Sequence, residues 1–163
     1  MGRLFDAVAS LLGLSNYITY QAQAAIKLET AASEANSRNA MKTNESYCYQ
    51  IEYNEGYFII NTVPIISDIV KDIKAGVSRE VIAGKFHNTV IDFSVSFCEL
   101  IREKYNINTA ALSGRVFQNK VITEGIYKRL REKGFKVYIH SRIPCNDGGL
   151  SVGQLVIANY MKY

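Results

Sequence analysis

The sequence predicts an α/β domain in which a small mixed sheet is flanked by helices, and three observations lead to this prediction. A β-hairpin pattern follows the helical first part of the chain, at residues 47–60. Beyond residue 109, strand, turn, helix and strand follow in an order that implies a parallel crossover. Between these regions apolar residues recur at spacings of three and four, which is typical of amphipathic helices.

The first 46 residues are predicted to form a helical lead-in. Apolar residues from Leu4 to Leu12 make one stripe of a helix that Gly13 can end. Alanine-rich sequence predicts a second helix from about Tyr20 to Glu34. The polar run from Ala35 to Ser46 is typical of a loop.

Residues 47–163 are predicted to form the α/β sheet lobe. Strands at Tyr47–Tyr53 and Tyr57–Ile60 flank a short turn and make the hairpin. A helix is predicted from Pro64 to Gly76. Ser78 is a plausible N-cap for a longer helix reaching Ile101, which should be the spine of the domain.

The C-terminal part is predicted to alternate short strands and helices, at Thr109–Leu112, Asn119–Lys133, Lys136–His140 and Gly148–Met161. In parallel sheets, ligands gather at the carboxyl ends of the strands. That rule points to segments 113–119 and 144–149. The sequence contains no internal repeat and no second core, so residues 1–163 are predicted to be one domain.

Composition limits the class of protein. A chain of 163 residues with 48% hydrophobic content can fill a single core. Basic and acidic residues are interleaved and the net charge is only +4, so nucleic-acid binding is not indicated. The three cysteines form no Cys-x-x-Cys pair and suit a reducing cytoplasm. No run approaches about 18 apolar residues, so no membrane span is predicted.

The chain enters helical periodicity at once, at Gly2–Asp6, and shows no signal-peptide pattern. We therefore expect Met1 to be an added or incidental start on a chain cut from a longer protein.

The first candidate binding segment, 113–119, joins the end of a strand to the start of a helix, where a phosphate is favoured. Gly114 would let the backbone approach a ligand closely, and the Asn119 amide could hydrogen-bond a ribose or phosphoryl oxygen. The alternative is an ordinary turn in which Asn119 caps the helix, and the segment taken alone favours the cap.

The second candidate segment, 144–149, places a carboxylate and two glycines between a strand and the final helix. Asp147 is either a hard oxygen ligand for a metal that also touches phosphates or a helix cap, and taken alone it favours the cap. Asp6 is expected in a first helical turn, where the helix dipole alone would favour it. His87 and His140 lack a second ligand at metal-binding spacing and are predicted to be structural.

Five short motifs follow one another along the whole chain. They are GRLFDAVA with LLG, QAAI, FHNT, LSG with VFQN, and NDGG with GQ, within residues 2–13, 23–26, 86–89, 112–119 and 146–154. Together, in this order and spacing, they resemble the C-terminal domain of the hydrogenase maturation family HypF. That domain is similar to the universal tRNA threonylcarbamoyl-adenosine transferases. The resemblance implies one lobe of the actin-like, ribonuclease H-like superfold.

The resemblance also implies a function. Members of the family make carbamoyl adenylate from carbamoyl phosphate and ATP in an upstream domain, and their C-terminal region passes the carbamoyl group to the terminal cysteine of HypE. By this resemblance Asp6 would contact the ribose or adenylate, Gly114 and Asn119 would line the nucleotide phosphate site, and Asp147 would be one ligand of an iron or zinc ion. The implied partners are HypE and the missing N-terminal HypF domains. A homodimer is left open, and no general base is identified.

Three departures from the family pattern shape what we expect of this chain. Arg115 stands where the family usually has a second glycine, and Gln21-Ala22 replaces a usual Glu-Gly. The family's metal is also held by two histidines, four residues apart, in the preceding subdomain, and this chain has no such pair. We therefore predict that the isolated chain folds but neither transfers carbamoyl groups nor retains a metal. Nucleotide binding should be weak, because the ligand lies between two lobes in this superfold and only one is present.

Two other functions stay open. Threonylcarbamoyl transfer to tRNA would be favoured by a basic groove and salt-dependent RNA binding. A non-catalytic module of the same fold would dock a partner or its own copy, and size-exclusion measurement with and without HypE would detect it.

Overall fold

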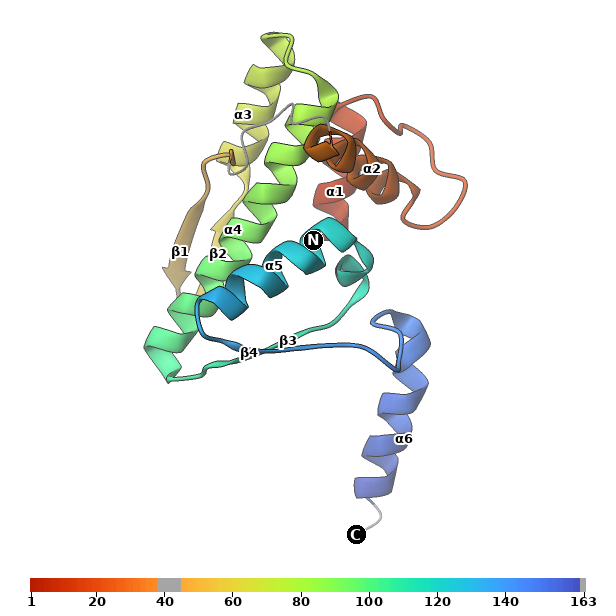
Figure 1. Ribbon diagram of the computed structural model, residues 1–163, viewed down its shortest axis with the longest axis vertical. Coiled ribbons are helices and arrows are strands. Elements are labelled where there is room, and N and C mark those ends of the chain that lie inside the picture. The colour runs from red at the N-terminus through yellow and green to blue at the C-terminus, as the bar shows by residue number, and fades with distance from the viewer. Residues whose placement is uncertain (38–44, 162–163) are drawn as a thin grey trace.

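The structure is a computed structural model that describes residues 1–37 and 45–161. It confirms the α/β class, with small sheets among helices (Figure 1). The elements, in chain order, are α1 (Gly2–Leu11), α2 (Gln23–Ser37), β1 (Gln50–Asn54), β2 (Tyr57–Asn61), α3 (Val63–Lys74), α4 (Arg79–Tyr105), β3 (Thr109–Leu112), η1 (Arg115–Gln118), α5 (Lys120–Glu132), β4 (Lys136–Ile139), η2 (Asp147–Gly149) and α6 (Leu150–Tyr160).

Helix α4 is the spine that the sequence predicts. The Ser78 hydroxyl caps it by accepting the Val81 N–H at 3.4 Å, and Asn106 ends it in the left-handed conformation. Figure 1 shows α4 running through the middle of the molecule, with the hairpin on one side and α1 and α2 on the other. Helices α2 and α5 both pack on α4, and α1 packs on α2. The core is therefore built around one helix.

The strands form two separate sheets in the described part of the chain. Strands β1 and β2 pair antiparallel across a two-residue turn, Glu55-Gly56, in which both φ angles are positive. Strands β3 and β4 pair in parallel, as the crossover predicts. The structure thus refines the expected single mixed sheet into two. The hairpin stays apart because it packs against α4, where the ring of Phe58 in β2 lies edge-on to the ring of Phe97 with their centres 6.2 Å apart.

Several element boundaries differ from the sequence prediction. Helix α2 begins at Gln23 and continues to Ser37, so the first three residues of the expected loop, 35–37, are helical. Residues 38–44 of that loop lie outside the described residues. The first strand begins at Gln50 rather than Tyr47, because the Tyr47 N–H donates to the Thr89 hydroxyl at 2.8 Å instead of to a strand. The final helix begins two residues later than Gly148, after η2.

A partly buried polar cluster ties the segment before β1 to two helices. The Tyr47 hydroxyl donates to Asp72 of α3 at 2.8 Å, and the Lys85 ammonium of α4 donates to the same carboxylate at 2.7 Å. Burial and the hydrogen bond to Asp72 raise the pKa of Tyr47. This tyrosine therefore stays protonated and serves as a structural donor.

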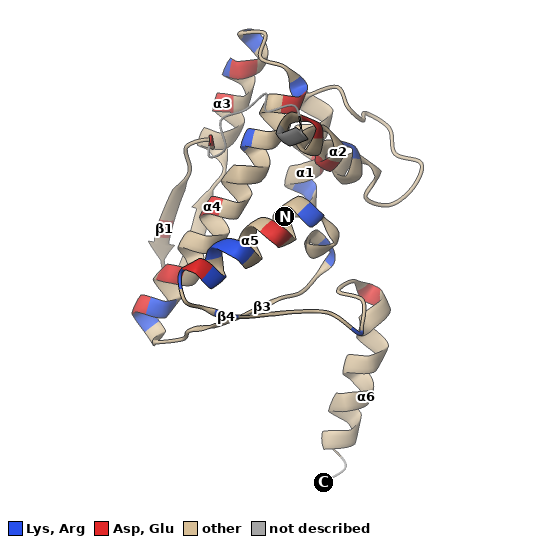
Figure 2. Ribbon diagram, viewed as in Figure 1, with Lys and Arg blue, Asp and Glu red and all other residues tan. Residues whose placement is uncertain are grey.

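Helix α6 stands apart from the other elements. None of its residues is buried, and it packs mainly against η2, which precedes it (Figure 1). Its exposed side chains include Leu155, Val156, Ile157 and Tyr160, and Figure 2 shows no charged residue along it. Among the described residues, no helix is both long enough and apolar enough to cross a membrane. An apolar helix left open to water normally belongs in contact with another surface.

Candidate functional site

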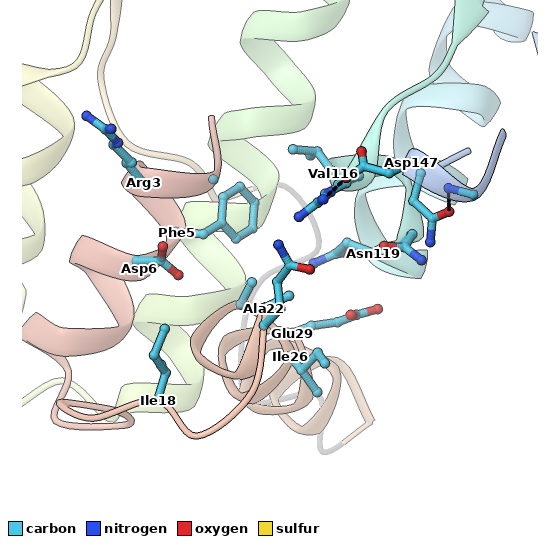
Figure 3. A pocket seen from close by; sticks show the side chains of 17 residues that line it. Arg3, Phe5, Asp6, Ile18, Ala22, Ile26, Glu29, Val116, Asn119 and Asp147 are labelled. Carbon is cyan, nitrogen blue, oxygen red and sulfur yellow. Dashed lines mark hydrogen bonds and ion pairs between the residues drawn. The ribbon is translucent and has the colours of Figure 1, made fainter. Parts of the chain in front are cut away.

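A cavity of about 930 Å³ lies where α1, α2 and the two predicted loops meet, as Figure 3 shows. Asp6 reaches it from α1, Glu29 from α2, and Asn119 and Asp147 from the loops that follow β3 and β4. Its apolar lining includes Phe5, Ile18, Ile26 and Val116. A concave site of this size, with a few polar groups on an apolar lining, suits a ligand as large as a nucleotide.

The parallel sheet brings the two loops together. Leu112 of β3 lies opposite Ile139 of β4, so the loops begin at the same edge. The Gly114 N–H donates to the Cys145 carbonyl at 2.9 Å and joins them directly. Gly114 has φ 104° and ψ 164°, a conformation that essentially only glycine adopts. Gly114 itself does not line the cavity. It shapes the loop after β3 and joins that loop to the loop after β4.

Asn119 has two fixed hydrogen bonds. Its side-chain oxygen accepts the Ile122 N–H at 3.0 Å, which confirms Asn119 as the N-cap of α5. Its amide nitrogen lies 3.0 Å from Nε2 of His87, and only 8% of the residue is exposed. The amide nitrogen carries a second hydrogen, which leaves one donor for a ligand in the cavity.

His87 holds Asn119 in place and is structural, as predicted. Its Nδ1 lies 2.8 Å from the Ala83 carbonyl, which can only accept, so Nδ1 carries the hydrogen and Nε2 accepts from Asn119. Burial lowers the pKa of His87 to about 4, despite the hydrogen bond to Ala83 that raises it. Phe5, which lines the cavity, packs edge-on against this ring at 5.5 Å. The neutral ring thus supports the cavity wall from behind.

Asp147 forms an ion pair with Arg115 across the two loops. The cap of η2 is Asn146, whose side chain accepts the Gly148 N–H at 3.0 Å, so the interpretation of Asp147 as the capping residue is wrong. Asn146 is the cap because its side chain reaches the Gly148 N–H, whereas the Asp147 side chain turns toward the Arg115 guanidinium.

The ion pair also bears on the metal that the family resemblance implies. Arg115 pairs with the Asp147 carboxylate in this structure, and one carboxylate alone does not hold a transition metal tightly. Within residues 1–37 and 45–161, no three His, Cys, Asp or Glu side chains are grouped to hold a metal ion. The residues present therefore do not fit a metal centre by themselves.

Asp6 lies farther along α1 than expected. It is the fifth residue of the helix, and the first turn contains no acidic residue, so the dipole explanation for Asp6 is wrong. Its side chain is exposed and faces the cavity, with Asn119 and Asp147 on the opposite side in Figure 3. The structure therefore brings three of the four candidate residues, Asp6, Asn119 and Asp147, around one cavity.

The sequence analysis missed two features of the lining. Glu29 accepts the Lys120 N–H at 2.7 Å and so occupies the first amide of α5, a contact between residues 91 positions apart that no local pattern announces. Ala22 lines the cavity with a positive φ of 64°. The only available signal for Ala22 was that it stands where the resembled family usually has glycine.

Comparisons with known proteins point to one family. A family model described as "Carbamoyltransferase, Kae1-like Domain, second subdomain" matches residues 1–154. The probable carbamoyltransferase HypF of Methanocaldococcus jannaschii is 33% identical over 94% of this chain. The carbamoyltransferase HypF of Synechocystis sp. is 31% identical over 96% of it. This chain spans 19% of the length of each of these curated relatives.

Solved structures give the same result. A crystal structure of full-length HypF in the phosphate- and nucleotide-bound form superposes with a TM-score of 0.89 at 39% identity. The match covers 99% of this chain and 20% of that chain. The crystal structure of T. kodakarensis HypF has a TM-score of 0.77 at 24% identity and supports the fold alone.

Proposed function

This chain belongs to the HypF carbamoyltransferase family, and we propose that it is the C-terminal lobe of an enzyme that carbamoylates the C-terminal cysteine of HypE. The donor would be carbamoyl adenylate, formed from ATP and carbamoyl phosphate in another domain. The observation that carries the proposal is the convergence of Asp6, Asn119 and Asp147 on one cavity large enough for an adenylate.

The lining suggests how the adenylate would sit. The Asp6 carboxylate can accept hydrogen bonds from ribose hydroxyls, and the free amide hydrogen of Asn119 can donate to a phosphoryl oxygen. Apolar side chains such as Ile18 and Ile26 can cover the base. Gly114 would contribute by holding the phosphate loop in shape rather than by direct contact.

The transfer itself is an acyl substitution. The cysteine sulfur of HypE would attack the carbamoyl carbon, and the bond from that carbon to the AMP phosphate oxygen would break. AMP would leave with the electron pair, and the thiol proton would pass to solvent or to a base outside this lobe. Such a reaction requires the leaving phosphate to be held and its charge neutralised.

We expect the metal to be bound in the full-length protein and not by this chain alone. An iron or zinc ion would need ligands beyond the described residues, because Asp147 is the one ligand that the family resemblance implies here and no group of three metal-binding side chains surrounds it.

The proposed partners include the remaining HypF domains, in a cytoplasmic setting. The exposed apolar face of α6 supports this part of the proposal, because an exposed apolar surface of this kind marks a site of contact with another protein surface. Copurification of this chain with a separately expressed N-terminal HypF portion tests the docking. Loss of the complex on Leu155→Glu is the expected result, and an unchanged complex would contradict it.

Nucleotide titration tests the proposed site. We expect the isolated chain to bind ATP or AMP weakly by NMR and to transfer no carbamoyl group to HypE alone. Asp6→Asn should weaken binding about tenfold, the effect of losing one charged hydrogen bond. Asp68→Asn, on α3 outside the cavity, is the matched control and should leave affinity unchanged.

Several outcomes would contradict the proposal. Sub-micromolar ATP affinity, or carbamoyl transfer by the chain alone, would contradict the single-lobe assignment. Salt-dependent tRNA binding without nucleotide binding would favour threonylcarbamoyl transfer, and HypE binding without any nucleotide site would favour an interaction module.

A further inference from the structure

The ion pair between Arg115 and Asp147 is placed where a ligand can break it. Both residues line the cavity, and their side chains are 47% and 59% exposed. An ion pair this exposed contributes little to stability, because water screens it and two flexible side chains must be ordered. Its partners can therefore be exchanged at small cost.

The rest of the cavity offers little positive charge to an anionic ligand. The acidic lining residues are Asp6, Glu29 and Asp147, and the basic ones are Arg3 and Arg115. Figure 3 shows the Arg3 side chain extending away from Asn119 and Asp147. Arg115 is thus the cationic lining residue that lies on the loops at the carboxyl ends of the parallel strands.

The start of α5 is largely closed to a phosphate. Glu29 takes the Lys120 N–H, and the Asn119 side chain takes the Ile122 N–H. A carboxylate already sits at this helix terminus, so it would repel a second anion. Two of the N–H groups at the start of α5, which the sequence predicted to favour a phosphate, therefore already have hydrogen-bond partners within the protein.

Resting on the proposed function, we infer that Arg115 is the phosphate-binding cation of this site and that it exchanges Asp147 for the phosphoryl group of a bound nucleotide. The planar guanidinium can make two parallel hydrogen bonds to phosphoryl oxygens. AMP, the leaving group of the proposed transfer, is a phosphate monoester that carries more charge than one carboxylate and so competes for Arg115. The phosphate of carbamoyl adenylate carries one charge, as a carboxylate does, and still offers two oxygens to the guanidinium. Binding through this residue needs no divalent metal in this lobe.

A titration with four proteins tests the inference. The wild-type chain, Arg115→Gln, Arg115→Lys and Asp147→Asn are each titrated with AMP by NMR, first in EDTA and then with added Zn²⁺. We expect wild-type binding in EDTA and a loss of about tenfold or more in Arg115→Gln, the usual effect of removing a charged hydrogen-bonding partner. Arg115→Lys should fall between them, because lysine keeps the charge and loses the paired geometry.

Asp147→Asn separates the inference from a metal-ligand role for Asp147, because the two predict opposite changes in AMP affinity. Removing the competing carboxylate should leave AMP affinity in EDTA equal to or several-fold tighter than wild type. A metal ligand at Asp147 would instead make binding depend on Zn²⁺ and would make Asp147→Asn weaker. Both side chains are exposed, and unchanged circular dichroism would verify that each variant is folded.

The outcomes distinguish the role of Arg115 from the existence of the nucleotide site. If the wild type binds AMP and Arg115→Gln binds equally well, or if binding requires Zn²⁺, the inference about Arg115 is overturned while the nucleotide site stands. If no protein binds AMP in either buffer, the inference and the proposed nucleotide site both fail.

Discussion

Acidification from about pH 7 to about pH 5 should destabilise the fold through His87. The pKa of this histidine falls from 6.5 to about 4 on folding, because burial penalises the charged ring. The unfolded chain therefore binds the proton more readily than the folded one. The stabilisation is complete above the unfolded value of 6.5 and is lost progressively as the pH falls toward 4. At about 1.4 kcal/mol per pKa unit, the loss should be about 2 kcal/mol near pH 5 and about 3 kcal/mol below pH 4.

Urea unfolding followed by circular dichroism at both pH values measures this loss. His87→Gln should flatten the dependence, because glutamine does not titrate, although the variant should be less stable than the wild type at pH 7. His140→Gln is the control, since His140 is the chain's other histidine and is exposed, and it should keep the wild-type slope. A slope that survives in His87→Gln, or disappears in His140→Gln, would refute the reasoning.

Three further predictions concern single side chains. Ala22→Gly should raise the free energy of unfolding by about 1 kcal/mol, since it relieves a left-handed alanine at some cost in chain entropy, and an equal or lower urea midpoint would contradict this. Gly149→Ala should lower the free energy of unfolding by about 1–3 kcal/mol, seen as a lower melting temperature, because the new Cβ would lie 2.6 Å from the Pro144 carbonyl oxygen. Gly153→Ala, with open space around it, should leave the melting temperature unchanged. Asp72→Asn should cost about 1–2 kcal/mol at neutral pH. Burial would raise the pKa of Asp72, but hydrogen bonds from Lys85 and Tyr47 lower it overall, so the wild type should lose this stabilisation below about pH 3.8 and the variant should not.

Local periodicity predicted most of the elements because it reflects backbone geometry that neighbouring residues decide. The apolar spacing of α4 and its Ser78 cap depend on residues a few positions apart, and the structure confirms both. The convergence of the two loops was also predictable, because parallel strands end at one edge of a sheet. These inferences require no knowledge of tertiary packing.

The missed features depend on contacts between distant segments. The hydrogen bond from Lys120 to Glu29 joins α5 to α2, and nothing near either residue signals it. The pairing of Arg115 with Asp147 follows from the direction that Gly114 gives to its loop, which spacing cannot supply. The positive φ of Ala22 was missed because alanine is not a turn residue.

Helix α6 has a consequence for experiments in dilute solution. Isolated helices shorter than about 12–15 residues are only marginally stable in water, and α6 has 11 residues with none buried. Its backbone amides should therefore exchange with deuterium almost as fast as those of a random coil, while those of α4 stay protected. Slowed exchange confined to Leu150–Tyr160 on adding the remaining HypF domains would then show that α6 is the surface that binds them.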